Sequence, residues 1–211
     1  MSVILCYGDS NTHGTMPMRV AGVSERHPRG ARWPDAMARA LGRDHQVLSE
    51  GLPGRTTVHD DPVEGGERNG LKLLSPVLHS HKPLDLMIVM LGTNDLKSRF
   101  SVTSWEIARS VERIVLAARI EAVCRAEIIV CPAPVRETGT LVDVFAGAEA
   151  RQAGLSRHLR AVAGRLGCAF VDAGEVVTVS ERDGVHWEAE DHLRFGEVMA
   201  EAVTRSLGAL T

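Results

Sequence analysis

The sequence has few aromatic residues and no run of basic ones. Four Phe, three Trp and one Tyr make up 4% of the 211 residues, too few for an extended surface on which sugar rings or bases could stack. Lys and Arg number 24 against 27 Asp and Glu, which gives a formal net charge of −3. We therefore expect neither nucleic acid nor an anionic membrane as the main partner.

Cysteine is also scarce, and its spacing is not that of a metal site. The sequence contains no CxxC pair and no Cys/His cluster among its four cysteines, Cys6, Cys124, Cys131 and Cys168, so we expect no bound metal. Three of them lie in or beside apolar runs, where a free Cys is typically a small buried hydrophobe.

Long hydrophobic runs are missing as well. No stretch reaches the roughly 18 consecutive apolar residues of a membrane span, and the first ten residues, MSVILCYGDS, do not resemble a signal peptide. The sequence therefore predicts a cytoplasmic protein, in a compartment where thiols stay reduced.

Short apolar runs alternate with amphipathic segments along the whole chain. The runs are rich in Val, Ile and Leu, which is typical of strands buried on both faces of a parallel sheet: Val3–Tyr7, Val47–Ser49, Leu84–Leu91, Glu127–Cys131 and Ala169–Val171. One expected helix is opened by the capping box of Thr103 and Glu106 and runs to about Val123. The other expected helices are Pro34–Leu41, Asn69–His81 with Pro76 inside it, Ala148–Leu166 and Ala189–Leu207. This alternation predicts one doubly wound α/β domain over residues 1–211.

Four polar segments lie at predicted strand ends or before the last helix, and the first contains a serine. Gly8-Asp9-Ser10-Asn11 directly follows the first strand. A Ser at a tight strand-to-helix turn has an exposed hydroxyl and a free backbone N–H, as a nucleophile that attacks a carbonyl requires. Turn and N-cap chemistry explains the same residues, so this segment alone does not decide between the two readings.

The other three segments supply donors and a base. Gly54 can present a backbone N–H to a ligand, although a structural turn explains it equally well. Asn94 offers an NH₂ donor at the end of the most apolar strand, and the neighbouring Asp95 fits a turn or a helix cap. Asp183 and His186 are three positions apart, so the carboxylate can accept from imidazole Nδ1 while Nε2 faces a substrate.

Most of the nine histidines have no nucleophile or carboxylate in a comparable position at a strand end. Asp191 and His192 are an adjacent pair that we expect on the surface of the first turn of the last helix. The long Pro/Gly-rich loops Gly14–Arg32 and Thr57–Arg68 are of the kind that is functional or mobile.

Together, the four segments resemble the motif blocks of the SGNH (GDSL-like) hydrolases, and they span nearly the whole chain. The match extends beyond the motifs to CYGDSNTHG, EGLPGRTTVHDDP, LDLMIVMLGTNDLK and DGVHW, which are similar to the arylesterase, acetyl esterase and acyltransferase branch. The resemblance implies a three-layer α/β/α sandwich with a five-stranded parallel sheet in the flavodoxin-like order 2-1-3-4-5, and no cofactor. Asn11 departs from the Leu in the family name, which leaves the acyl preference open.

The resemblance also implies roles for individual residues. Ser10 would be the nucleophile, His186 the base and Asp183 its partner, with the Ser10 N–H, the Gly54 N–H and the Asn94 side chain as the oxyanion hole. Residues placed by position in the substrate pocket are Asn11, His13, Arg55, Pro134, Val135, Val185 and Trp187.

The expected reaction is the hydrolysis of short-chain esters, acetyl esters in particular, through an acyl-serine. Acetylated carbohydrates and aryl acetates are the implied substrates, and transfer of the acyl group to alcohols can compete with hydrolysis. This branch of the family contains homo-oligomers, so the resemblance implies that this chain also forms a homo-oligomer. A flavodoxin-like module that binds a small molecule or sugar without catalysis is the alternative, although the chain has no phosphate-binding glycine loop.

Overall fold

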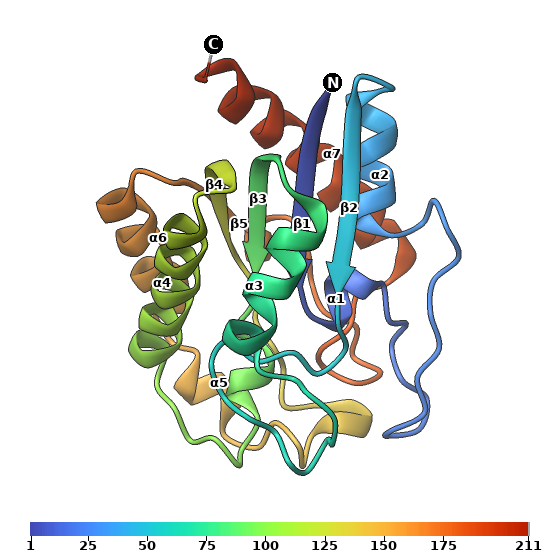
Figure 1. Cartoon of the computed structure of the whole chain (residues 1–211). Helices are drawn as coiled ribbons and strands as arrows, with labels where there is room; N and C mark the ends of the chain where they lie inside the picture. Colours follow the sequence, from blue (N-terminus) through green and yellow to red (C-terminus); the bar gives the residue numbers. More distant parts are fainter. Residues whose placement is uncertain (211) are drawn as a thin grey trace.

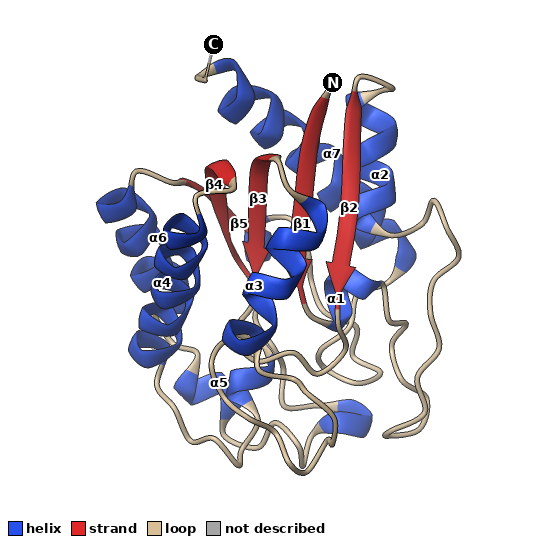
Figure 2. Ribbon diagram, viewed as in Figure 1, coloured by secondary structure: helices blue, strands red, loops and turns tan. Residues whose placement is uncertain are grey.

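Five strands form one parallel sheet in the part of the chain that the computed structural model describes, residues 1–210. The strand order is β2-β1-β3-β4-β5 (Figures 1 and 2), which confirms the predicted topology. The strands are β1 (Ser2–Gly8), β2 (His45–Gly51), β3 (Leu84–Met90), β4 (Cys124–Cys131) and β5 (Ala169–Asp172).

Seven α-helices connect or flank these strands within the described residues. They are α1 (Ser10–His13), α2 (Trp33–Leu41), α3 (Gly70–His81), α4 (Ser104–Glu121), α5 (Ala148–Arg151), α6 (Leu155–Leu166) and α7 (Ala189–Gly208). Short 3₁₀ turns occur at η1 (Asn94–Leu96), η2 (Gly139–Leu141) and η3 (Ala173–Glu175). No helix in residues 1–210 is both long and apolar enough to cross a membrane.

The sheet has an apolar core on each face because neighbouring residues of a strand point to opposite sides. In β1, Leu5 and Tyr7 pack with α3, α4 and α6, whereas Ile4 and Cys6 pack with α2 and α7. The same alternation runs through β3 and β4. Both faces of the central strands are therefore covered, and the carboxyl ends of the strands carry the loops that form the polar sites (Figure 1).

Local capping explains where two of the helices begin. The Thr103 side chain accepts from the Glu106 N–H, and the Glu106 carboxylate accepts from the Thr103 N–H, so the predicted capping box opens α4. The Asn69 side chain accepts from the first N–H groups of α3, and that helix continues through Pro76.

The helix predicted over Ala148–Leu166 is two helices. The first helix ends at Arg151, and Gly154 is the N-cap of the second, with a φ of +81°, a left-handed conformation that glycine adopts without steric penalty. The chain therefore turns between α5 and α6, and apolar periodicity across residues 148–166 did not reveal this break.

Two helical glycines give opposite predictions for substitution by alanine. A Cβ at Gly196 in α7 would lie 2.5 Å from the Ala36 Cβ of α2, whereas a Cβ at Gly164 in α6 would meet nothing within 4 Å. Gly164→Ala should raise the free energy of unfolding by about 0.5–1 kcal/mol, because alanine is the better helix former. Gly196→Ala should lower it by about 1–3 kcal/mol, because the α2–α7 contact must open. Urea unfolding of both variants measures the change in the free energy of unfolding. Equal stabilisation by the two substitutions would contradict the close contact of α2 with α7 at Gly196.

Candidate active site

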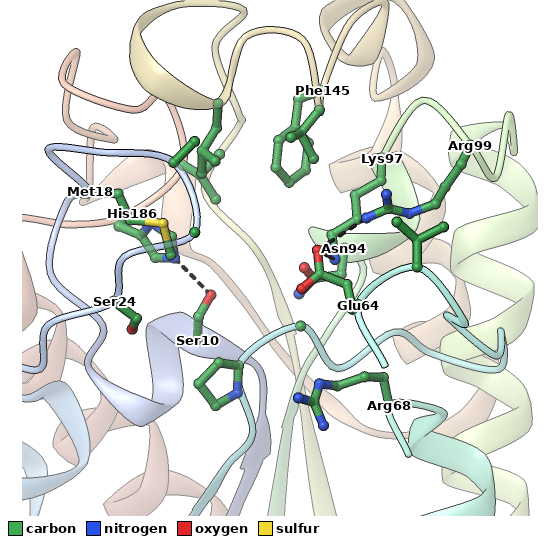
Figure 3. Close-up of a pocket in the computed structure, with 18 residues that line it drawn as sticks. Ser10, Met18, Ser24, Glu64, Arg68, Asn94, Lys97, Arg99, Phe145 and His186 are labelled. Atoms are coloured by element: carbon green, nitrogen blue, oxygen red, sulfur yellow. Dashed lines mark hydrogen bonds and ion pairs between the residues drawn. The ribbon is translucent and has the colours of Figure 1, made fainter. Parts of the chain in front are cut away.

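The four predicted polar segments meet at the carboxyl ends of the strands. Ser10 is the first residue of α1, directly after β1, and Asn94 follows β3. Gly54 follows β2, and the loop with Asp183 and His186 precedes α7. Figure 3 shows Ser10 at the floor of a cleft, with His186 on one side and Asn94 on the other.

Ser10, His186 and Asp183 form a continuous chain of hydrogen bonds. The Ser10 Oγ lies 3.0 Å from His186 Nε2, and His186 Nδ1 lies 2.6 Å from Asp183 Oδ2. All three side chains are nearly buried, with Ser10 5%, His186 3% and Asp183 0% exposed. The imidazole therefore lies between a hydroxyl and a carboxylate, each within direct proton-transfer distance.

The Asp183 carboxylate accepts more hydrogen bonds than the one from the imidazole. Its Oδ1 accepts from the N–H groups of Val185 and His186, both at 2.9 Å, and its Oδ2 also accepts from the Met18 N–H at 2.7 Å. Burial by itself raises the pKa of Asp183, but the His186 ring and these backbone donors outweigh it and hold the pKa below its ordinary value. The carboxylate is thus held in its ionised form.

Gly54 and Asn94 both line the cleft, and Asn94 lies on the side of Ser10 opposite to His186 (Figure 3). The Asn94 Nδ2 donates to the Arg55 carbonyl at 3.1 Å, which fixes the amide and leaves its second N–H for the cleft. Gly54 has a φ of +81°, and a Cβ there would lie 3.2 Å from Arg68 Nε. Both the turn and the crowding favour glycine at this position.

Asp95 fastens the loop of Gly54 to that of Asn94. The Asp95 carboxylate is fully buried and accepts from the backbone N–H and the hydroxyl of Thr57. Burial raises its pKa, although the bonds from Thr57 act in the opposite direction. The sequence favoured a turn or cap role for Asp95, and its link to a loop 38 positions away could not be inferred from local pattern.

The cleft has a volume of about 400 Å³, and its lining side chains are of two chemical kinds, which we call the apolar wall and the charged wall. The apolar wall consists of Met18, Val63, Leu141, Val144, Phe145 and Val185. The charged wall consists of Glu64, Arg68, Lys97 and Arg99 (Figure 3). Lys97 Nζ lies 2.9 Å from Glu64 Oε1, and Arg99 binds the same oxygen at 3.1 Å.

These wall residues were missed in the sequence, apart from Val185. The one available signal was the length of the loops Gly14–Arg32 and Thr57–Arg68, which carry Met18 and Glu64 respectively. Loop length indicates function but not which side chains face inward.

Six of the seven residues expected in the pocket lie elsewhere. Val185 lines the cleft. The Asn11 Nδ2 instead donates to the Val185 carbonyl at 3.2 Å, and Arg55 is buried over the Tyr7 ring, donating to the Gly8 carbonyl. Position next to a motif residue therefore did not identify the wall of the cleft.

The remaining expected pocket residues are also turned away from it. Val135 packs in the core, and Pro134 lines a separate cavity with Cys131. The Trp187 ring is fully buried against Phe195, so it forms no wall of the cleft. His13 Nδ1 lies 3.2 Å from Thr15 Oγ1.

His192 is buried rather than on the helix surface, so that expectation was wrong. Its ring is 0% exposed and packs against Trp187 and His27, with centroid distances of 5.1 Å to each. Burial, with a smaller contribution from His27, lowers the pKa of His192 to about 3, which keeps the ring neutral. Helical position alone could not reveal this, because one covering ring, His27, comes from a distant loop and the other, Trp187, turns inward just before the helix.

No group of His, Cys, Asp and Glu side chains that could hold a metal ion occurs in residues 1–210. A hydroxyl beside an imidazole, with a buried carboxylate behind it and N–H donors opposite, can carry out nucleophilic attack on a carbonyl carbon.

Asp9 gives a pH-dependent prediction for stability. Its carboxyl is 1% exposed, and burial raises its pKa to about 6 despite the hydrogen bond from the Asn11 N–H. The folded state therefore keeps a proton that the unfolded state loses near pH 4, so this group destabilises the fold as the pH rises toward 7. Asp9→Asn retains the acceptor that caps the helix. Between pH 4 and 7, its free energy of unfolding should rise relative to that of the natural chain by up to about 3 kcal/mol.

Thermal unfolding of both proteins across this pH range measures the gain. Asp143→Asn, which removes an exposed carboxylate, is the control. A difference in Tm between Asp9→Asn and the natural chain that does not change with pH would contradict the raised pKa.

Comparison with known proteins identifies the family. Residues 6–200 match the GDSL-like lipase/acylhydrolase family, whereas no curated protein matches the chain. The solved aryl esterase of M. smegmatis is 34% identical, with a TM-score of 0.92 over 98% of this chain and 100% of that one. Est24, a carbohydrate acetylesterase from Sinorhizobium meliloti, is 33% identical, with a TM-score of 0.91 and the same coverage. The chain therefore belongs to the GDSL-like lipase/acylhydrolase family, has the SGNH hydrolase fold and is a carboxylic ester hydrolase.

Proposed function

We propose that this chain is a serine esterase that cleaves short-chain esters, acetyl esters in particular, through an acyl-serine intermediate. The observation that carries the proposal is the hydrogen-bonded series Ser10, His186 and Asp183 at the floor of the cleft. A module that only binds a sugar or another small molecule has no use for a hydroxyl activated in this way.

In the first step, His186 Nε2 takes the proton from the Ser10 hydroxyl as Oγ attacks the ester carbonyl carbon. The negative charge that develops on the carbonyl oxygen is stabilised by the N–H groups of Ser10 and Gly54 and by the Asn94 amide. Asp183 stays ionised and stabilises the imidazolium, because its pKa is lowered. The tetrahedral intermediate then releases the alcohol, which takes the proton from His186 Nε2.

In the second step, the acyl group leaves Ser10. A water molecule gives a proton to His186 Nε2 and its oxygen attacks the acyl carbon, which releases the carboxylic acid and restores the Ser10 hydroxyl. An alcohol that occupies the place of water accepts the acyl group instead. Transfer and hydrolysis thus share one intermediate.

For the substrate we propose an acetylated carbohydrate or an aryl acetate. Two kinds of relative support this. The M. smegmatis structure is an aryl esterase, and of two structures from Sinorhizobium meliloti, Est24 is a carbohydrate acetylesterase and the other, 38% identical, is a carbohydrate acetylesterase family member. The cleft is consistent with both, since its apolar wall suits an acyl or aryl group and its charged wall suits hydroxyl groups. We also propose a homo-oligomer, as the branch of the family implies, and a cytoplasmic location.

The nucleophile is tested by covalent labelling. A fluorophosphonate should phosphonylate Ser10 Oγ, and Ser10→Ala should abolish both the labelling and nearly all esterase activity, with kcat reduced by about 10⁶. Ser24→Ala is the matched control, because Ser24 lines the same cleft but has no imidazole partner in the described structure, and it should keep both. Esterase activity that survives in Ser10→Ala would overturn the assignment. An unlabelled natural chain would favour the passive binding module.

The acyl preference is tested with p-nitrophenyl esters from C2 to C12, which share one leaving group. The ratio kcat/KM should be greatest at C2 and fall as the chain lengthens, because the acyl group and the leaving group must share a cleft of about 400 Å³. A maximum at C8 or longer would contradict the short-chain proposal and leave the serine mechanism intact.

A further inference from the structure

The loop from Gly14 to Arg32 forms part of the cleft wall and also reaches the triad. Its base is held by a bridge between Thr15 and Arg26, with the His27 N–H donating to the Gly14 carbonyl at 2.8 Å. Beyond this base, the loop lines the cleft with Met18, Ala21, Gly22 and Ser24, and Met18 lies beside His186 in Figure 3. A loop that lines the cleft thus also lies beside His186.

Met18 is the residue of this loop that contacts the triad acid. Its N–H donates to Asp183 Oδ2 at 2.7 Å, the same oxygen that accepts from His186 Nδ1 at 2.6 Å. The two donors to Oδ1, Val185 and His186, belong to the loop of Asp183 itself. Met18 is therefore the donor that ties the carboxylate to a distant part of the chain.

Thr140 holds Met18 from the other side. The Thr140 hydroxyl donates to the Met18 carbonyl at 2.8 Å, and the Thr140 N–H donates to the carbonyl of Arg182, the residue before Asp183, at 2.9 Å. These bonds close a ring through Thr140, Met18, Asp183 and Arg182. Gly139 permits the close approach, since a Cβ there would lie 2.2 Å from the Arg182 carbonyl oxygen.

We propose that Thr140 is a positioning residue for the triad, acting through Met18 on the Asp183 carboxylate. Its hydroxyl fixes residue 18, the Met18 N–H fixes Asp183 Oδ2, and Oδ2 sets the orientation of the His186 ring toward Ser10. A second anchor of the same loop supports this, because His27 Nε2 donates to the carbonyl of Trp187 at 3.0 Å. The loop is thus attached on both sides of His186.

The inference rests on the proposed serine mechanism, and Thr140→Val tests it. Valine keeps the shape of threonine and removes the hydroxyl, so kcat should fall about three- to tenfold, the effect of one hydrogen bond, while KM stays within about twofold. Thr140→Ser, which restores the hydroxyl, should recover kcat to within about twofold. The low-field proton resonance of His186 Nδ1–H should move in Thr140→Val and return in Thr140→Ser.

Thr204→Val is the matched control, because the Thr204 hydroxyl also donates to a backbone carbonyl, that of Ala200, in α7 far from the triad. It should leave kcat and the resonance unchanged. An unchanged kcat and resonance in Thr140→Val, an equal loss in Thr204→Val, or failure of serine to restore either property would each overturn the role of Thr140. If the natural chain cleaved no ester, the serine mechanism itself would fail, and the resonance would still report whether Thr140 positions the His186–Asp183 pair.

Discussion

The close approach of α1 to the ends of two strands is the constraint on which the site depends. Gly8 of β1 pairs with Gly51 of β2. A Cβ at Gly8 would lie 2.0 Å from Thr12 Oγ1, and one at Gly51 would lie 2.1 Å from the His13 N. Because neither position has a side chain, α1 rests directly on the sheet and its first residue, Ser10, projects into the cleft. The register of β1 with β3 then sets how far Asn94 lies from that hydroxyl.

Two buried carboxyl groups beside this helix show how their surroundings decide charge. Asp9 and Asp183 are both almost fully buried, yet burial raises the pKa of Asp9 to about 6, whereas that of Asp183 is lowered. The difference lies in the donors, since Asp183 accepts from three backbone N–H groups and an imidazole. Asp183 is held in its ionised form because the His186 ring and, to a smaller extent, backbone N–H groups of its own loop and of Met18 donate to the carboxylate.

Features that depend on neighbouring residues could be predicted from the sequence. The apolar strands, the capping box at Thr103 and the three-residue spacing of Asp183 and His186 all follow from local chemistry, and the structure contains each of them. Features that depend on packing between distant segments could not be predicted. Trp187 follows His186 directly, but its ring turns into the core against Phe195, and position in the chain says nothing about that direction.

The walls of the cleft depend on packing between distant segments, so the specificity of the cleft does not follow from local sequence. Its charged wall joins Lys97, which follows β3, to Glu64 in the loop after β2, and its apolar wall takes Met18 from the loop after α1. Met18 also holds the triad acid through its N–H. Changes in that loop that alter the shape of the cleft therefore also alter the position of Asp183. In the proposed mechanism, substrate preference and catalytic rate are therefore linked, because Met18 both lines the cleft and donates to Asp183.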